Sequence, residues 1–303
     1  MKQIGRYRLE AVEGFGAFAT VWRGFDSELE IPVAIKVLAE NWAHHADVRE
    51  RFLAEARLLR RIEDPRVVRV HDIGTHEDRP FFVMDFVPGG TVADRVATPP
   101  GATDEALRLA IESARAVQVL HDAGMLHRDV KPSNLLVGDD GRVLVADLGS
   151  AKRLAEASGV TVTTGTPAYM APEQARSAPV DERSDVYSLG AVTYELLSGR
   201  PPYDVTDPGA LLHRANDSRP DPIAGRRGLP RSLDHVLASS LATRRTDRPA
   251  SASEFADALE QVAGGVKVRN IRRVRREVSP ALATVLALLV FAGSAAATWY
   301  GIR

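Results

Sequence analysis

The 303-residue chain has no cysteine, so neither a disulfide framework nor a zinc site built from thiolates can belong to its structure. Its 39 basic and 40 acidic residues leave a formal net charge of -1, which gives no electrostatic reason to expect a nucleic-acid partner. Aromatic residues make up only 6% of the chain, yet 45% of its residues are hydrophobic, enough for a substantial core. The first residues, 1–6, do not read as a secretory signal. We therefore expect a globular protein whose chemistry lies in local motifs.

One short segment combines a base, a cation and metal ligands. It reads His127-Arg128-Asp129-Val130-Lys131-Pro132-Ser133-Asn134, and Asp147-Leu148-Gly149 follows after a short gap. Phosphoryl transfer needs such a set, because the attacking hydroxyl requires a proton acceptor, the γ-phosphate requires positive charge and Mg²⁺ requires hard oxygen ligands. We expect Asp129 to be the base and Lys131 the cation, with Asn134 and Asp147 as metal ligands.

This segment closely resembles the catalytic loop of the eukaryotic-type protein kinases. A His-Arg-Asp triplet alone would more often be a solvated loop, but the full eight residues with Asp-Leu-Gly downstream are specific. The resemblance implies an α+β, bilobal kinase fold over residues 5–262, with a small β-rich N-lobe at about 5–86 and a larger helical C-lobe at about 87–262. It also implies ATP as the phosphoryl donor and Mg²⁺ as the metal ion, with Mn²⁺ as an alternative.

Residues that bind the nucleotide are expected before the catalytic loop. A turn between two strand-like segments contains Gly14-Phe15-Gly16-Ala17, where glycines let backbone N–H groups approach a phosphate. This pattern alone would more often be a simple β-hairpin turn. Val33-Ala34-Ile35-Lys36 adds context, since it resembles the family's strand whose lysine holds the α- and β-phosphates. The third glycine position of the loop is Ala19, which keeps its backbone N–H and restricts only φ.

A buried Lys36 requires an acidic partner, and the candidate is Glu55 in the helical pattern of 51–59. The alternative is that Glu55 lies on the surface, since Glu50 is nearby. The resemblance implies that Met84 lines the inner pocket and that the backbone of Asp85 and Val87 binds the adenine edge. The residues expected around the nucleotide are Gly14, Phe15, Gly16, Ala17, Val21, Ala34, Lys36, Glu55, Met84, Asp85, Val87 and Asn134.

The Ser/Thr-rich stretch 157–164 resembles an activation loop. Phosphate on Thr161, Thr163 or Thr164 would give Arg128 a strong acceptor, and a passive flexible loop is the alternative. The following segment, Gly165-Thr166-Pro167-Ala168-Tyr169-Met170-Ala171-Pro172-Glu173, matches the family's substrate-docking segment. By resemblance, this segment favours protein substrates over small molecules, and Lys131 with Thr166 favours serine or threonine as the acceptor.

The resemblance also assigns structural roles. Asp185 is expected to bind the backbone of the catalytic loop, and Arg248 is expected to pair with Glu173. Leu148 stands where the family more usually has phenylalanine, and it still offers an apolar plug. A helix at 105–124 and a hairpin around Asp139-Asp140-Gly141 are expected to support the site from behind.

The C-terminal end has a different composition. A linker at 263–277 carries clustered basic residues, and 278–300 contains no charged residue over a length that can cross a bilayer core of roughly 30 Å. We expect a single transmembrane helix at 278–300 in the cell membrane. The basic cluster precedes this helix, whereas a lone Arg303 follows it, and the side with more basic residues usually stays in the cytoplasm. The kinase domain is therefore expected to be cytoplasmic and the C-terminus outside. The spacing Gly293-x-x-x-Ala297 suggests a homodimer whose members phosphorylate each other.

The whole chain therefore resembles the eukaryotic-type serine/threonine protein kinases that occur in bacteria, here with a membrane anchor. We expect it to phosphorylate proteins, including its own activation loop. Two other functions remain open. The first is a membrane-tethered pseudokinase scaffold, which the intact Lys36, Asp129, Asn134 and Asp147 disfavour. The second is a small-molecule kinase, which the docking segment disfavours.

Overall fold

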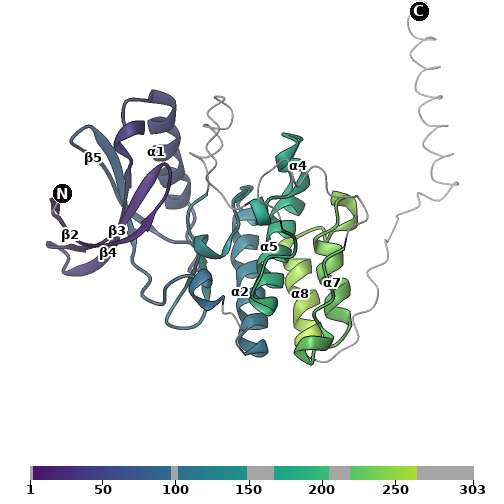
Figure 1. Ribbon diagram of the computed structural model, residues 1–303. Helices are drawn as coiled ribbons and strands as arrows, with labels where there is room; N and C mark the ends of the chain where they lie inside the picture. Colours follow the sequence, from purple (N-terminus) through teal and green to yellow (C-terminus); the bar gives the residue numbers. More distant parts are fainter. Residues whose placement is uncertain (1–2, 97–101, 149–166, 205–218, 265–303) are drawn as a thin grey trace, which may run out of the picture. The chain divides into compact units, whose positions relative to one another are not determined.

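The computed structural model describes residues 3–96, 102–148, 167–204 and 219–264 (Figure 1). All of them belong to one compact unit, Met1–Lys267. The predicted transmembrane segment 278–300, most of the basic linker and the predicted activation loop 157–164 lie outside the described residues. Within the described ranges, no helix combines the length and the apolar character needed to cross a membrane.

Residues 3–85 contain six strands that form one antiparallel sheet with the order β1-β2-β3-β4-β6-β5. Helix α1 (Ala46–Arg60) connects β4 to β5 and packs against β5 and β6 (Figure 1). The strands are β1 (Gln3–Ile4), β2 (Tyr7–Phe15), β3 (Ala19–Asp26), β4 (Ile31–Leu38), β5 (Val70–His76) and β6 (Arg79–Asp85).

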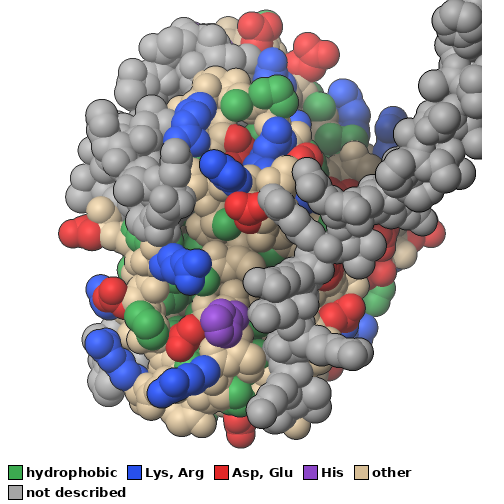
Figure 2. Space-filling model, turned by 90° about the vertical axis from the view of Figure 1, so that its right-hand side faces the viewer, with side chains coloured by type: hydrophobic (Ala, Val, Ile, Leu, Met, Phe, Trp, Pro, Cys, Tyr) green, Lys and Arg blue, Asp and Glu red, His purple; other side chains and the backbone are tan. Residues whose placement is uncertain are grey.

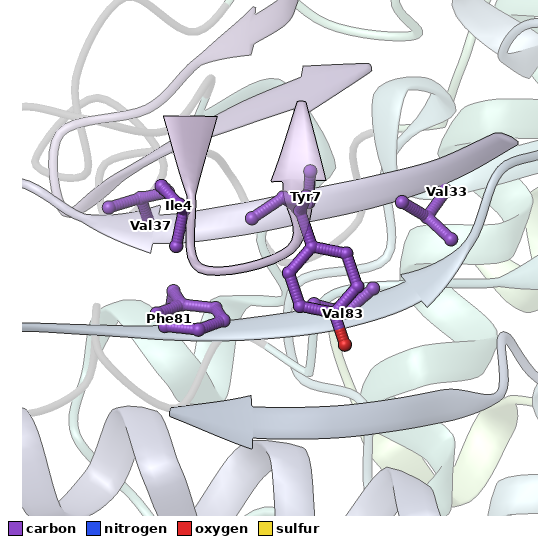
Figure 3. Packing of buried hydrophobic residues seen from close by; sticks show 7 residues of the cluster. Ile4, Tyr7, Val33, Val37, Phe81 and Val83 are labelled. Carbon is purple, nitrogen blue, oxygen red and sulfur yellow. The ribbon is translucent and has the colours of Figure 1, made fainter. Parts of the chain in front are cut away.

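One face of this sheet is a closed hydrophobic cluster. Side chains alternate along a strand, so Val33, Ile35 and Val37 of β4 share one face. Figure 3 shows several of these valines together with Tyr7 and Phe81, whose rings meet edge to face with centroids 6.3 Å apart. The Tyr7 hydroxyl donates to the Asp72 carboxylate at 2.6 Å, so the polar end of the ring is also satisfied.

The opposite face of β4 turns Ala34 and Lys36 toward the side on which α1 packs. Phe52 of α1 stacks on Phe82 of β6 with ring centroids 5.0 Å apart, which seats the helix on this face. Residues 33–38 are consequently buried on both sides, although the strand carries a lysine. The sheet thus places the charged side chain of Lys36 in the buried layer between β4 and α1.

The second half of the described chain is mainly helical. Helix α5 (Glu182–Ser198) is buried along nearly its whole length, as expected for a helix with apolar or small residues on all sides. It contacts α2 (Thr103–Asp122), α7 (Ser232–Ser240) and α8 (Ala252–Ala263), and the single-turn helix α4 (Pro172–Ala175) precedes it (Figure 1). Six 3₁₀ turns complete the described elements: Glu40–Trp42, Val92–Arg95, Pro132–Asn134, Pro167–Tyr169, Gly225–Arg227 and Arg245–Asp247.

The predicted hairpin near Asp139 is confirmed as β7 (Leu135–Val137) and β8 (Val143–Val145), with Gly141 in the left-handed region at φ +79°. The helix predicted at 105–124 begins two residues earlier and ends at Asp122, and Gly124, at φ +72°, turns the chain away from the helix axis. On the face shown in Figure 2, basic and acidic side chains are interspersed. The predicted combination of a β-rich first half and a helical second half is confirmed.

The close approach of Gly89 to the β7 strand generates a stability prediction. A Cβ at Gly89 would lie 2.0 Å from the Val137 carbonyl oxygen, a backbone atom that cannot turn aside. We expect Gly89→Ala to lower the free energy of unfolding of the full chain by about 1–3 kcal/mol, measured by denaturant titration. The control is Gly225→Ala, where a Cβ meets nothing within 4 Å. Equal stability of the two variants would contradict the prediction.

Candidate active site

Lys36 is the charged group at the centre of the site. Its ammonium lies 2.8 Å from Glu55 Oε1 and 3.0 Å from Asp147 Oδ1, and its side chain is only 9% exposed. Burial by itself lowers the pKa of Lys36, but the negative charges of Asp147 and Glu55 outweigh it and raise the pKa, so the lysine stays protonated. The predicted pairing with Glu55, rather than with Glu50, is confirmed, and it links β4, α1 and the residues that follow β8.

Asp129 is held by its own loop. Lys131 Nζ lies 2.8 Å from Asp129 Oδ2, and the side-chain amide of Asn134 donates to the Asp129 carbonyl oxygen at 2.9 Å and to Oδ2 at 3.2 Å. The Asp129 side chain is 14% exposed, so it reaches solvent through a small opening only. A carboxylate placed in this way can orient a hydroxyl and accept its proton.

The backbone of the catalytic loop, 127–134, is bound to the start of α5. Asp185 accepts the backbone N–H groups of His127 at 2.9 Å and of Arg128 at 2.7 Å, and His121 Nε2 lies 2.9 Å from the same carboxylate. Arg128 adopts a left-handed conformation with φ +63°, which costs a non-glycine residue roughly 1–2 kcal/mol. The predicted role of Asp185 as an anchor for this backbone is confirmed.

The candidate metal ligands lie at the ends of the β7–β8 hairpin. Leu135 pairs with Val145, and the N–H of Ala146 donates to the Asn134 carbonyl at 3.0 Å, so Asn134 and Asp147 flank the same end of the hairpin. The Asn134 amide nitrogen is used by Asp129, which leaves the amide oxygen as a possible ligand, and the Asp147 side chain is 41% exposed. Two hard oxygen groups of this kind suit Mg²⁺, which binds proteins through one or two carboxylates plus substrate phosphates.

No cluster of three or more His, Cys, Asp or Glu side chains suited to a metal occurs within the described ranges.

Leu148, next to Asp147, is 4% exposed and fills an apolar position as predicted.

The predicted phosphate loop is the turn between β2 and β3. Gly14 pairs with Val21, and the N–H of Gly16 donates to the Ala19 carbonyl at 2.8 Å. Ala19 does not adopt a positive φ and is buried at the start of β3, so alanine fits the third glycine position without backbone strain. Phe15 at the tip is 83% exposed.

The phosphate loop is held by a contact that no local sequence pattern indicated. The Trp42 indole N–H donates to the Ala17 carbonyl at 2.9 Å, and the Trp42 ring packs on Phe18 with centroids 5.0 Å apart. Trp42 lies between β4 and α1, so its contact could not be read from local periodicity.

The predicted adenine side of the pocket lies between β4 and β6. Ala34 pairs with Met84 in the antiparallel register, so the two side chains lie on the same face as Lys36, and Met84 is buried. The N–H of Asp85 donates to the Arg69 carbonyl at 3.0 Å. Val87 lies two residues after the end of β6, outside any helix or strand, and is half-buried.

The docking segment is described from Pro167 onward. Glu173 forms a two-point ion pair with Arg248, at 2.7 and 2.9 Å, and accepts from the Ser184 hydroxyl at 2.6 Å. Burial tends to raise the pKa of Glu173, but Arg248 and Ser184 outweigh it and hold this pKa below its usual value. The guanidinium of Arg248 also lies over the Tyr187 ring at 4.9 Å. The predicted Glu173–Arg248 pair is confirmed.

Gln174 is a second residue that sequence analysis missed. Its side-chain nitrogen donates to the Arg128 carbonyl at 2.7 Å, and its oxygen accepts the N–H of Ala171 at 3.0 Å. Gln174 stands three residues after the residue that caps α4, a position where glutamine often returns to the backbone, and this was the available sequence signal. The three candidate threonines, Thr161, Thr163 and Thr164, lie outside the described residues, as does Thr166.

Comparison with known proteins places these features in a family. A family model described as protein kinase domain matches residues 7–258. The chain is 37% identical over 265 residues to the serine/threonine-protein kinase PknL of Mycobacterium tuberculosis, covering 85% of this chain and 66% of PknL. It is 36% identical over 269 residues to the serine/threonine-protein kinase PknB of Mycobacterium leprae, covering 86% of this chain and 43% of PknB.

Among solved structures, the PknI kinase domain of Mycobacterium tuberculosis matches with a TM-score of 0.66 and 31% identity, covering 86% of this chain and 97% of that one. The described chain therefore shares the bilobal fold of this kinase domain.

The Glu173–Arg248 pair generates a second stability prediction. Removing one member of a buried ion pair leaves an uncompensated charge, so Arg248→Met is expected to lower the free energy of unfolding by about 3–5 kcal/mol. Arg245→Met is the control, because Arg245 binds Asp181 in a half-exposed pair that contributes about 0–1 kcal/mol. Denaturant titration of both full-length variants gives the comparison, and a loss below about 1 kcal/mol for Arg248→Met would contradict the prediction.

Proposed function

Because the chain belongs to the protein kinase domain family, we propose that it transfers the γ-phosphoryl group of ATP to serine and threonine hydroxyls of proteins. The observation that carries this proposal is the Lys36–Glu55 ion pair, which protein kinases need in place for transfer, with Asp147 beside the same ammonium. We assign residues 5–262 to the kinase domain, with the lobes meeting at about residue 86.

The family uses ATP with Mg²⁺. Asn134 and Asp147 are the residues that would hold the metal, which supplies positive charge against the phosphates. Asp129 orients the acceptor hydroxyl and takes its proton, and Lys131 beside it offers a cation to the transferred group. Lys36 contributes a second cation for the phosphates from β4. Positioning and charge therefore account for most of the expected catalysis.

The remaining nucleotide contacts follow the same assignment. The turn Gly14–Ala17 with Val21 would cover the phosphates, while Ala34, Met84 and the backbone of Asp85 and Val87 would bind the adenine. The docking segment supports a protein substrate, because it resembles a segment that protein kinases carry and that small-molecule kinases of related fold generally lack.

We further propose that the chain phosphorylates its own loop. In the parts of the chain that the structure describes, the Arg128 guanidinium has no ion pair, and the candidate acceptors Thr161, Thr163 and Thr164 follow Asp147 in the sequence. A phosphate there would supply oxygens that an arginine binds strongly.

The C-terminal sequence supports a membrane anchor. Residues 278–300 are uncharged over a membrane-spanning length, and the basic residues of 265–277 favour a cytoplasmic kinase domain. The Gly293-x-x-x-Ala297 spacing supports a homodimer through this helix.

The kinase proposal predicts phosphate on the activation loop. The full chain incubated with Mg-ATP is expected to gain phosphate on Thr161, Thr163 or Thr164, as mapped by mass spectrometry. Asp129→Asn removes the base while keeping the side-chain size, so its signal is expected to fall at least 100-fold, within the usual range for a general base. If the wild-type chain and the Asp129→Asn variant gained equal amounts of phosphate, the labelling would come from a contaminating kinase.

If ATP binds and no acceptor is labelled, the pseudokinase scaffold is the better description. Mixing the active chain with a tagged Asp129→Asn chain tests the dimer in the same assay, because phosphate on the tagged chain requires transfer between molecules. Transfer confined to the active chain would contradict phosphorylation within a dimer.

The anchor proposal predicts that the full chain expressed in bacteria stays in the membrane fraction after carbonate extraction. Replacing Leu289 and Val290 by arginine places two charges at the helix centre, each costing about 2.5–3.5 kcal/mol for insertion, and is expected to release the chain. The matched control places the same charges at Gln261 and Ala263, exposed positions of α8, and is expected to remain bound. A wild-type chain found in the soluble fraction would refute the anchor.

A further inference from the structure

A single amide side chain joins the docking segment to the catalytic loop. Gln174, in α4, donates to the Arg128 carbonyl at 2.7 Å and accepts the N–H of Ala171 at 3.0 Å. Its two partners belong to segments more than 40 positions apart in the sequence. The amide therefore forms a direct link between the backbone that would hold the substrate and the backbone that precedes Asp129.

The Arg128 carbonyl is a sensitive place for such a link. Arg128 is held at φ +63°, and a non-glycine residue keeps this conformation only where its surroundings determine it. Asp185 binds the Arg128 N–H at 2.7 Å from the side of α5, and Gln174 binds its carbonyl from the side of α4. The residue is thus fixed at both of its backbone polar groups, and Asp129 follows it directly.

The link also lies beside the base. Gln174 lines the same small cavity as Arg128, Asp129, Lys131, Tyr169 and Met170. A shift of the Arg128 carbonyl would therefore also displace the Asp129 side chain. The displacement would occur at the face that an acceptor hydroxyl approaches.

Both contacts at once require a side chain that carries a donor and an acceptor, which an amide has at every pH and a carboxyl has only when it is protonated. An ionised glutamate of the same size could accept from Ala171 but would turn an oxygen toward the Arg128 carbonyl, and methionine has no donor and only a weakly accepting sulfur. The chemistry of the side chain, rather than its volume, is what the position requires.

We propose that Gln174 is a positioning residue for phosphoryl transfer, which fixes Asp129 through the Arg128 carbonyl and makes this placement depend on the docking segment. The inference rests on the kinase activity proposed above. It predicts a loss in the transfer step without a loss in nucleotide binding, because among the described residues the side chain of Gln174 is hydrogen-bonded to Arg128 and Ala171, neither of which is among the residues expected to bind the nucleotide.

The test compares Gln174→Met and Gln174→Glu with wild type in the full chain, measuring kcat and the KM for ATP on one protein substrate. We expect kcat to fall at least tenfold in both variants, with the KM for ATP changed less than twofold. Lowering the pH is expected to restore part of the activity of Gln174→Glu relative to wild type, since the protonated carboxyl regains a donor.

The matched control is Gln118→Met. Gln118 also donates one side-chain hydrogen bond, to Asp122 at 2.8 Å, and accepts one, from the Ser253 N–H at 2.8 Å, but it belongs to α2 and joins this helix to α8. It is expected to keep kcat within twofold of wild type. If Gln118→Met lowers kcat as much as Gln174→Met, the loss is a general effect of stability and the proposal is overturned.

Hydrogen–deuterium exchange separates this inference from the proposed function. Gln174→Met is expected to raise exchange at the amides of 127–129 at least threefold, whereas Gln118→Met is not. Unchanged exchange, or a kcat within twofold of wild type, overturns the positioning role. A wild-type chain that transfers no phosphate while Gln174→Met still raises the exchange contradicts the proposed function and leaves the backbone link standing.

Discussion

A buried lysine is the constraint on which the arrangement of this protein depends. The Lys36 side chain is almost fully removed from solvent, and an unpaired ammonium there would be too costly to keep. The fold meets this requirement with two carboxylates, Glu55 from α1 and Asp147 from the segment after β8. Pairing the lysine therefore ties α1 and the segment after β8 to β4, and it places the candidate metal ligand Asp147 beside this strand.

The catalytic loop depends on a second buried network. Asp185 at the start of α5 accepts the backbone N–H groups of His127 and Arg128. Gln174 donates to the Arg128 carbonyl, which directly precedes Asp129. The Glu173–Arg248 pair fixes the adjoining docking segment to the same helical half. Helix α5 is the element that makes this possible, because its burial on all sides holds Asp185 in one place. Rigid support of this kind is what a reaction driven by positioning requires.

Much of the site could be predicted because phosphoryl transfer constrains short stretches of sequence. The catalytic-loop segment, the lysine-bearing strand and the docking segment each hold their residues within a few positions, so the surroundings of Asp129 followed from a motif. The Glu173–Arg248 pair spans 75 positions and was expected only from the resemblance to the protein kinases. Sequence periodicity could not choose firmly between Glu50 and Glu55, since both belong to the same helical stretch. Packing of Phe52 on Phe82 sets the rotation of α1 and turns Glu55 inward. Trp42 and Gln174 were missed because their partners are brought to them only by the fold.

The sequence by itself determined which chemistry the chain can perform, since the identity and order of Lys36, Asp129, Asn134 and Asp147 follow from local motifs. It also determined the alternation that sends Lys36 to one face of β4 and the hydrophobic cluster to the other. The tertiary structure decided between Glu50 and Glu55 as the partner of the lysine, and only the tertiary structure showed that Trp42 holds the phosphate loop and that Gln174 holds the Arg128 carbonyl. The reason is physical: periodicity acts over neighbouring residues, whereas the pairing of a buried charge or carbonyl depends on groups far away in the chain that folding brings within about 3 Å.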